Sequence, residues 1–325
     1  MSERDIDAVS GSGTDDSANY EDGDIVKTES SFRYFIRKLL AKKIRIIATV
    51  TIIAIILVAI FAPVLAPHNP DETFGLFQPP NSHSVGHFDD DGQTERAFHP
   101  LGTDSFGHDV LSRVIFGTRI SLLVAFASVG IGSFVGSLIG LLAGYYGGWI
   151  DDLLMRYIDF QWAFPEIVLA IGIVAFTGGL GVWNVVLAIS IAYFDDFARV
   201  VRGEVLSIRE SEYIKSARVI GMSDLRIMVK EILPNAVAPL IVQMTVLFPL
   251  AILWEASLSF LGLGVKPTTP TWGLLIASGR AYITSYWWIT IVPGVAIMIT
   301  ALAFNIEGDT LRDIFDVKRG EELER

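Results

Sequence analysis

An uninterrupted apolar run near the start of the chain restricts what it can fold into more than any other feature. Residues 46–65 read IIATVTIIAIILVAIFAPVL and contain no charged side chain. About 20 such residues form a helix long enough to cross the ~30 Å hydrocarbon core of a bilayer. A cleaved signal peptide is shorter and lies closer to residue 1. A helix buried in a soluble core is disfavoured because similar segments follow. We therefore expect a membrane-spanning helix here.

Six apolar segments of this kind occur along the chain. They cover residues 44–66, 121–145, 160–176, 182–200, 234–253 and 287–306. The third and fourth are separated only by TGGLG, residues 177–181, which favours a tight turn. This pattern predicts an all-α membrane protein with six transmembrane helices.

The basic residues indicate how these helices are oriented. A cluster precedes the first segment, namely Arg33, Arg37, Lys38, Lys42, Lys43 and Arg45. Because cytoplasmic loops are enriched in Lys and Arg, the N-terminus is expected in the cytoplasm. Alternating the six helices then leaves 5 of the 25 basic residues in outer loops: Arg96, Arg113, Arg119, Lys266 and Arg280. We predict a multi-pass protein of the cell membrane.

Charge and cysteine content exclude several classes of function. The net charge is −11, and residues 1–30 hold nine acidic and two basic side chains. This segment is rich in Ser, Gly and Asp, which predicts a disordered acidic tail. A nucleic-acid partner is disfavoured, since phosphate contacts need basic clusters. The chain has no cysteine, which excludes disulfides and thiol chemistry.

A stripe of glycines marks the second apolar segment. The glycines lie four residues apart, so they share one helix face, and they are Gly132, Gly136, Gly140 and Gly144. Such a face lets another backbone approach closely. We expect this helix to be surrounded by protein, whereas the first segment has no such stripe and is expected at the periphery.

A polar, amphipathic stretch interrupts the apolar chain between the fourth and fifth segments. It reads SEYIKSARVIGMSDLRIMVKEILPN, residues 211–235. Gly221 suits the left-handed position that ends a helix, and Ser223 suits the N-cap of a second helix over residues 224–233. Residues 207–233 would form a knob on the cytoplasmic face. The knob could dock on a protein or rest on lipid, and its mixture of acids and bases favours a protein.

Two longer loops are expected outside the membrane. In residues 67–118, Asp109 starts a short interfacial helix whose apolar face includes Val110 and Val114. All five histidines lie within residues 67–118, and their irregular spacing favours solvated side chains over a metal site. Residues 256–284 contain glycines and prolines that predict a compact non-helical segment, either lining the outer mouth or serving as scaffold.

Acidic residues in or near the apolar segments are candidate functional groups. They are Asp159, Glu166, Asp195, Asp196, Glu255 and Glu307. Asp159 and Glu166 are seven residues apart and would share a helix face. A proton-coupled secondary transporter using such carboxylates is therefore one alternative, and solvated or helix-capping carboxylates are the other. A membrane enzyme finds no support, because H-E-x-x-H and G-x-S-x-G are absent.

The polar stretch resembles the EAA loop of ABC importer permeases. The triplet falls on Lys215-Ser216-Ala217, followed by Gly221 and by Leu233-Pro234-Asn235. Lys215 replaces the usual glutamate, and Glu231 stands where peptide-type members usually have histidine. The resemblance covers about residues 33–316 and includes HPLGTDSFGHDVLSRVIFGTRISL (99–122), FPEIVLAI (164–171), ARVVRGEVLSIRESEY (198–213), EASLSFLGLGVKPTTPTWGLLI (255–276) and PGVAIMITALAFNIEGDTLRDIFD (293–316). The chain is thus similar to the second permease type of dipeptide/oligopeptide (nickel) ABC transporters.

This resemblance implies a type I ABC importer permease core and a set of partners. They are a homologous second permease subunit, two ATP-binding subunits, an extracytoplasmic substrate-binding protein and membrane lipid. The chain lacks G-x-x-x-x-G-K-[ST], so ATP and Mg would be used by the partners, with no cofactor or metal bound here. It would be a transport subunit for di- or oligopeptides that works by alternating access, and not an enzyme.

The resemblance also assigns roles to residues and segments. Coupling to the ATPase would involve Glu212, Tyr213, Ile214, Lys215, Ser216, Ala217, Arg218 and Gly221. Independently of the resemblance, Asp159, Glu166 and Glu255 are candidates for the translocation path or gate, because ionisable residues in or near membrane spans are usually functional. The expected segments are the tail (1–30), the first helix with its outer loop (31–118), the permease core (119–309) and a cytoplasmic C-terminal tail (310–325).

Overall fold

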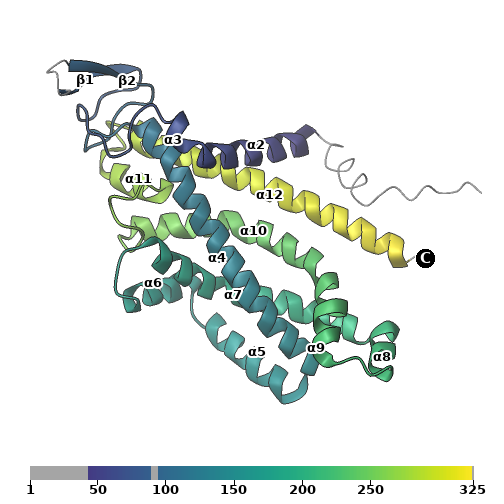
Figure 1. Cartoon of the computed structure of the whole chain (residues 1–325). Helices are drawn as coiled ribbons and strands as arrows, with labels where there is room; N and C mark the ends of the chain where they lie inside the picture. Colours follow the sequence, from purple (N-terminus) through teal and green to yellow (C-terminus); the bar gives the residue numbers. More distant parts are fainter. Residues whose placement is uncertain (1–42, 89–93, 324–325) are drawn as a thin grey trace, which may run out of the picture.

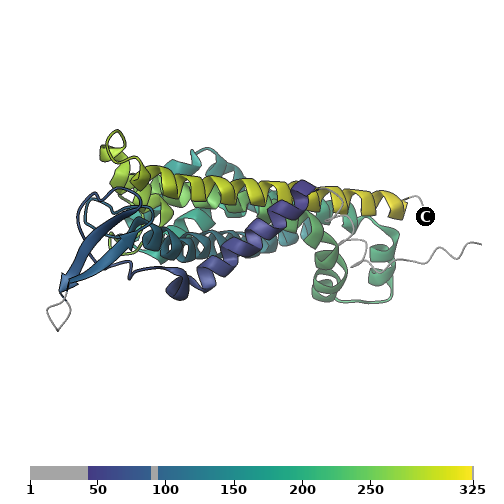
Figure 2. The same cartoon turned by 90° about the horizontal axis from the view of Figure 1, so that it is seen from above.

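The computed structural model describes residues 43–88 and 94–323, so the predicted tail of residues 1–30 lies outside it. The described chain is an elongated helical bundle with a β-hairpin at one end and α8 at the other (Figures 1 and 2). The helical elements are α2 (Lys43–Ile60), α3 (Ala62–Leu65), α4 (Val110–Tyr146), α5 (Gly148–Trp162), α6 (Glu166–Phe176), α7 (Val182–Arg209), α8 (Glu212–Val219), α9 (Asp224–Ile227), the π-helix η1 (Met228–Ile232), α10 (Leu233–Phe260), α11 (Trp272–Gly279), the 3₁₀-helix η2 (Arg280–Tyr282) and α12 (Trp288–Leu323).

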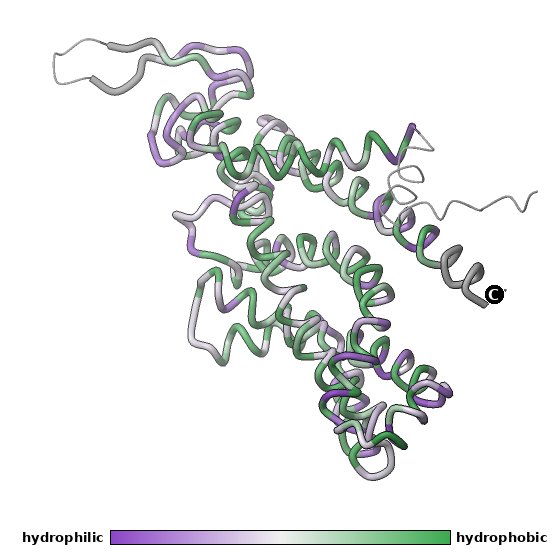
Figure 3. Tube along the Cα trace, turned by 45° about the vertical axis from the view of Figure 1, so that its right-hand side comes forward, coloured by the Kyte–Doolittle hydropathy of each residue, from purple (hydrophilic) through white to green (hydrophobic). Residues whose placement is uncertain are grey.

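Four helices of the described chain are long and apolar enough to cross a membrane. They are Lys43–Ile60, Val110–Tyr146, Asp224–Phe260 and Trp288–Phe315, and the bent pair α5–α6 would make five if it is one span. Apolar residues follow these helices, whereas polar ones gather at the hairpin and around α8 (Figure 3). Helix α7 carries Asp195, Asp196 and Arg199 and is not among the candidates. The expected six spans are therefore not confirmed.

The predicted third span, residues 160–176, is not one straight helix. Helix α5 ends at Trp162, α6 begins at Glu166, and the two are bent by 93°. Pro165 explains the break, because proline has no backbone N–H and disfavours a helical conformation at the residue before it, here Phe164. The turn predicted at residues 177–181 is confirmed, with positive φ angles at Gly178 and Gly179.

The glycine stripe of α4 packs directly on α7, as the sequence predicts. A Cβ atom added at Gly132 would lie 3.2 Å from the carbonyl oxygen of Ser190. At Gly136 and Gly140 it would overlap the carbonyl oxygens of Phe194 and Ala198, respectively. The two helices can therefore run side by side only because these side chains are absent.

The main hydrophobic core lies among α4, α7, α10 and α12. It includes Val124, Ile189, Phe248 and Phe304, and Trp272 of α11 closes it near the hairpin end. Helix α2 runs along α12 at the edge of the bundle, and only Arg45 and Ala48 of α2 are buried. The prediction that the first helix is peripheral is confirmed within this chain.

Two expectations about the loops at the hairpin end are wrong, and one element was not expected. The described chain is mostly helical, as predicted, but β1 (Ser82–Phe88) and β2 (Thr94–His99) add an antiparallel hairpin. The separate interfacial helix after Asp109 is instead the start of the 37-residue helix α4. The second loop contains helix α11, whose N-cap Thr271 accepts a hydrogen bond from the backbone of Leu274.

Adding one methyl group to the glycine stripe tests the packing of α4 on α7. We expect Gly140→Ala to lower the free energy of unfolding by at least about 1–3 kcal/mol, because the new Cβ would overlap backbone atoms of α7. Gly130→Ala on the same helix is the control, since no atom lies within 4 Å of its new Cβ. Thermal unfolding of the purified protein in detergent compares the two, and equal stability would contradict the packing argument.

Candidate functional site

The knob, residues 207–233, is built around a helix end at Gly221. Helix α8 stops at Ile220, and Gly221 takes a φ of 82°. The backbone N–H of Gly221 donates to Arg218 and that of Met222 donates to Ala217, both at 3.0 Å. These two bonds form the Schellman motif, which needs a left-handed residue at its centre. The predicted role of Gly221 as a helix terminator is confirmed.

One face of α8 is buried against the chain's own helices. Ile214 is fully buried, and Ala217 is nearly so. Both belong to a cluster with Val205 of α7, Leu141 of α4 and Ile232 of η1. In this structure the two residues hold the knob onto the bundle, and their contact with a partner stays a prediction.

Polar contacts fix the knob further. Arg218 lies over the ring of Tyr145, 5.1 Å from its centroid, and the Tyr145 hydroxyl donates to Asp224 at 2.6 Å. These contacts connect α8, α4 and α9. On the exposed side, Lys215 donates to Glu212 at 2.9 Å, and this hydrogen bond raises the pKa of the Lys215 ammonium. The lysine that departs from the family motif is thus paired within α8.

The outer surface of the knob exposes large apolar side chains. Val219, Ile220 and Leu225 are 86%, 77% and 70% exposed, respectively. We refer to these three residues as the knob patch. They lie on both sides of the Gly221 turn, where polar residues dominate the neighbouring sequence. An apolar group in such a polar setting is typical of a protein-binding surface.

The second half of the knob is continuous with α10. Ser223 is the N-cap of α9 by position, although its side chain makes no capping hydrogen bond. The expected helix over residues 224–233 is α9 followed by the π-helix η1, which leads directly into α10. Pro234 explains why η1 is a π-helix, because the proline ring would clash with the carbonyl of Lys230 in a regular α-helix. The second half of the knob and the fifth apolar segment therefore form one continuous helical segment, Asp224–Phe260, which we call the α9–η1–α10 rod.

The carboxylates predicted to share a helix face do not do so. Asp159 lies on α5 and Glu166 on α6, beyond the 93° bend. Asp159 is exposed and accepts a hydrogen bond from Arg199 at 2.8 Å. Glu166 lines a cavity together with Asp195 of α7. Asp159 and Glu166 therefore do not line one helix face, and the proton relay expected from their spacing finds no support in the part of the chain that the structure describes.

Glu255 is enclosed by hydroxyl groups. It is fully buried on α10, where its Oε1 accepts from Ser259 and Thr271, both at 2.8 Å. Ser121 of α4 lies 3.5 Å from its other oxygen. These contacts join α10, α4 and the N-terminus of α11. Glu255 thus holds three elements together, and its role in a gate stays a prediction.

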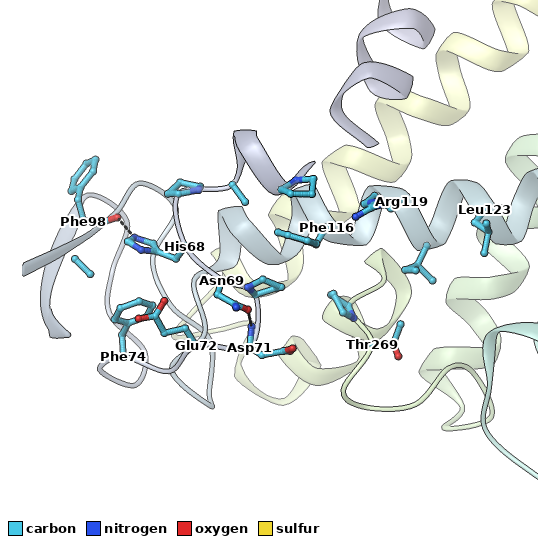
Figure 4. A pocket seen from close by; sticks show the side chains of 17 residues that line it. His68, Asn69, Asp71, Glu72, Phe74, Phe98, Phe116, Arg119, Leu123 and Thr269 are labelled. Carbon is cyan, nitrogen blue, oxygen red and sulfur yellow. Dashed lines mark hydrogen bonds between the residues drawn. The ribbon is translucent and has the colours of Figure 1, made fainter. Parts of the chain in front are cut away.

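A cavity of about 1200 Å³ opens at the hairpin end. The segment between α3 and α4 lines it with His68, Asp71 and Glu72, and α4 contributes Phe116 and Arg119 (Figure 4). Acidic, basic and aromatic side chains from distant parts of the sequence therefore meet around one cavity. The segment between α3 and α4 is a folded cap on the bundle with a concave surface.

Histidine 99 is part of a buried hydrogen-bond chain, which contradicts the expectation of solvated histidines. Its Nδ1 lies 2.9 Å from Asp109 and its Nε2 lies 2.6 Å from Ser84. Asp109 also caps α4 by accepting from the backbone of Ser112. His68 could join His99 and Asp109 around a metal ion, but its Nε2 is bonded to the carbonyl of Phe98 at 3.0 Å. His99 and Asp109 are thus hydrogen-bonded to one another, and His68 is held by the backbone of β2.

Asp104 organises the turn before α4. Its carboxylate accepts from the backbone N–H groups of Phe106 and His108 at 2.8 and 2.9 Å. The His108 ring and the Arg113 guanidinium lie 3.1 and 3.6 Å away. Burial opposes ionisation, but the hydrogen bonds and charge of His108, with Arg113, lower the pKa of Asp104.

Acid should weaken this turn. A carboxyl group whose pKa is lower in the folded state stabilises the fold above its unfolded pKa of about 3.9, and the stabilisation is lost as pH falls through the folded pKa. We expect Asp104→Asn to reduce the loss of thermal stability between pH 5 and pH 3. Asp71→Asn, in the same loop but exposed, is the control. An identical acid response of the wild type and Asp104→Asn would contradict this assignment.

Comparison with known proteins places the chain in a family. Residues 136–320 match the family model described as "Binding-protein-dependent transport system inner membrane component". Residues 30–80 match the "N-terminal TM domain of oligopeptide transport permease C".

Several permeases are similar over most of the chain. The dipeptide transport system permease protein DppC of Alkalihalophilus pseudofirmus is 42% identical over 89% of this chain and 90% of its own length. The di/tripeptide permease DppC of Pseudomonas aeruginosa is 43% identical over 81% and 84%. The glutathione permease GsiD of Pectobacterium atrosepticum is 39% identical over 88% and 91%.

The fold also has a solved counterpart. An inward-facing structure of the MetNI methionine ABC transporter aligns with a TM-score of 0.52 and 19% identity, covering 62% of this chain and 96% of that one. The fold agrees with the family match, and both agree with the membrane-spanning helices described above. The chain belongs to the binding-protein-dependent transport system inner membrane components, and it is therefore a permease subunit of an ABC importer and not an enzyme.

Proposed function

We propose that this permease transports di- or oligopeptides together with a homologous second permease subunit. The relatives named above are described as permeases for dipeptides, di/tripeptides and glutathione, and each aligns over more than 80% of both chains. The two permeases would form the path between them, within a core of about residues 119–309. A proton-coupled transporter is not favoured, because the family is that of ABC importers and Asp159 and Glu166 lie on different helices.

The knob would couple the permease to the ATPases. The observation that carries this proposal is the knob patch, three exposed apolar residues at the end of the molecule opposite the hairpin. Tyr213, which is half-exposed, would extend this surface, while Glu212, Lys215, Ser216 and Arg218 would form its polar rim. The two partner ATPases would use ATP and Mg, since the chain contains no phosphate-binding loop.

Opposite ends of the molecule would serve opposite sides of the membrane. The basic cluster before α2 supports a cytoplasmic N-terminus, and the knob would then face the ATPases in the cytoplasm. The hairpin end, with its folded loop and 1200 Å³ cavity, would receive the external substrate-binding protein. Closure of the ATPases would push the knob, and the α9–η1–α10 rod would transmit the movement into the membrane, giving alternating access.

A charge placed in the knob patch tests the coupling. We expect Ile220→Asp to reduce ATP-driven uptake of L-alanyl-L-alanine at least tenfold, because an aspartate cannot be desolvated against an apolar partner. Ile220→Val keeps the patch apolar and should retain uptake. Uptake by the reconstituted importer and co-purification of the ATPases are measured together. Unchanged uptake and co-purification of Ile220→Asp would refute the docking role.

The left-handed turn at Gly221 gives a second test. Gly221→Pro forces a negative φ and removes the N–H that donates to Arg218, so we expect transport to be abolished while membrane insertion persists. Gly221→Asn is the control, since asparagine tolerates the left-handed region better than other residues. Peptide uptake and the amount of protein in the membrane fraction are compared. Normal uptake by Gly221→Pro would show that the turn does not transmit movement.

A further inference from the structure

The break between α5 and α6 forms one wall of an open pocket that charged and aromatic side chains line together. Its volume is about 400 Å³, and its lining includes Trp162, Phe164 and Glu166 from the two sides of the break, Asp195 from α7 and Trp254 from α10. Interrupted helices in transporters commonly form binding sites, because the broken backbone makes room for polar groups at membrane depth. Two carboxylates and three aromatic rings thus line the same pocket.

Asp195 is the group in this cavity that most requires explanation. It is only 3% exposed, yet its Oδ1 has no hydrogen-bond partner among the residues that the structure describes. Leaving a buried carboxylate oxygen unpaired is costly, so a partner from outside the chain, such as water, an ion or a ligand, is expected to supply the missing hydrogen bond. Glu255, on the neighbouring helix α10, is also buried but is held by three hydroxyl groups. The contrast shows that this one oxygen of Asp195 lacks the hydroxyl donors that surround Glu255.

The charge around the cavity is negative. Glu166 and Asp195 line the pocket together, and Asp196 follows Asp195 in α7, so that both aspartates interact electrostatically with Glu166. Arg199 is the cation that interacts with Asp195 and Asp196. However, its guanidinium is paired with Asp159 at 2.8 Å and lies 4.1 Å from the Trp162 ring centroid. One shared positive charge does not balance these carboxylates.

We propose that this cavity binds the protonated amino group of the cargo, with Asp195 and Glu166 as its acceptors. An ammonium group offers three donors and one positive charge, which match unpaired carboxylate oxygens. Aromatic rings also attract ammonium groups through their negative faces. The identification of the cargo as a peptide rests on the proposed function. We refer to the cavity as the ammonium subsite.

Because the chain has no cysteine, one introduced thiol can report on the subsite. Phe164→Cys is placed in the lining, and the intact importer is labelled with a trimethylammonium-ethyl or a sulfonatoethyl methanethiosulfonate. We expect the cationic reagent to react at least about tenfold faster on this subunit, since one sign of charge concentrates the opposite ion. In a Phe164→Cys subunit that also carries Asp195→Asn and Glu166→Gln, the ratio of the cationic to the anionic labelling rate should fall close to the ratio measured for the control. Phe176→Cys, at the exposed far end of α6, is that control.

A competition experiment identifies the ligand. L-alanyl-L-alanine should slow cationic labelling of Phe164→Cys at least threefold, and N-acetyl-L-alanyl-L-alanine, which lacks the charged amino group, should not. The proposal would be overturned if the cationic reagent still reacted faster after Asp195→Asn and Glu166→Gln. It would also be overturned if neither peptide, or both peptides equally, slowed the labelling of Phe164→Cys. Co-purification of the ATPases with the substituted subunit verifies folding. Absence of ATP-driven uptake by the wild type would instead count against the proposed function and leave the labelling result in place.

Discussion

The close contact between α4 and α7 is the constraint on which the rest of this permease depends. Glycines 136 and 140 allow the backbones to touch, so the carbonyl oxygens of Phe194 and Ala198 lie against α4 without intervening side chains. This contact fixes α7 in the middle of the bundle although α7 carries charged residues. The lower part of the same helix pair then supports the knob through Leu141 and Val205. A single packing interaction thus positions both the buried carboxylates and the cytoplasmic coupling surface that we propose.

Local signals in the sequence predicted the parts of the fold that depend on local chemistry. The glycine stripe, the helix end at Gly221 and the helix start at Asp109 each follow from the conformational preference of one residue type. The break at Pro165 was missed because hydropathy measures how apolar a segment is and not its direction. The burial of Ile214 and Ala217 depends on helices far away in the sequence, so no local pattern could show which face of α8 meets solvent.

For the acidic residues of the candidate site, too, the sequence does not show which contacts distant helices provide. In the sequence, Asp159, Glu255 and Asp195 are equally conspicuous as charges within apolar surroundings. In the fold they have three different environments. Asp159 forms an exposed ion pair with Arg199, and Glu255 is surrounded by hydroxyl groups. Asp195 lines a pocket, and one of its oxygens has no hydrogen-bond partner within the described residues. Their partners come from other helices, and only the three-dimensional arrangement tells a structural carboxylate from one available to a ligand.

The π-helical turn before α10 has a consequence for how such permeases diverge. A π turn holds one residue more than the α turn it replaces, and each residue of a helix rotates the chain by about 100°. Loss or gain of a single residue within Met228–Ile232 would therefore swing α9 and Leu225 around the axis of α10 while leaving the transmembrane packing untouched. A permease would in this way present a differently oriented surface to a different ATPase, because α9 has rotated about the axis of α10, while the packing of its transmembrane helices stays the same.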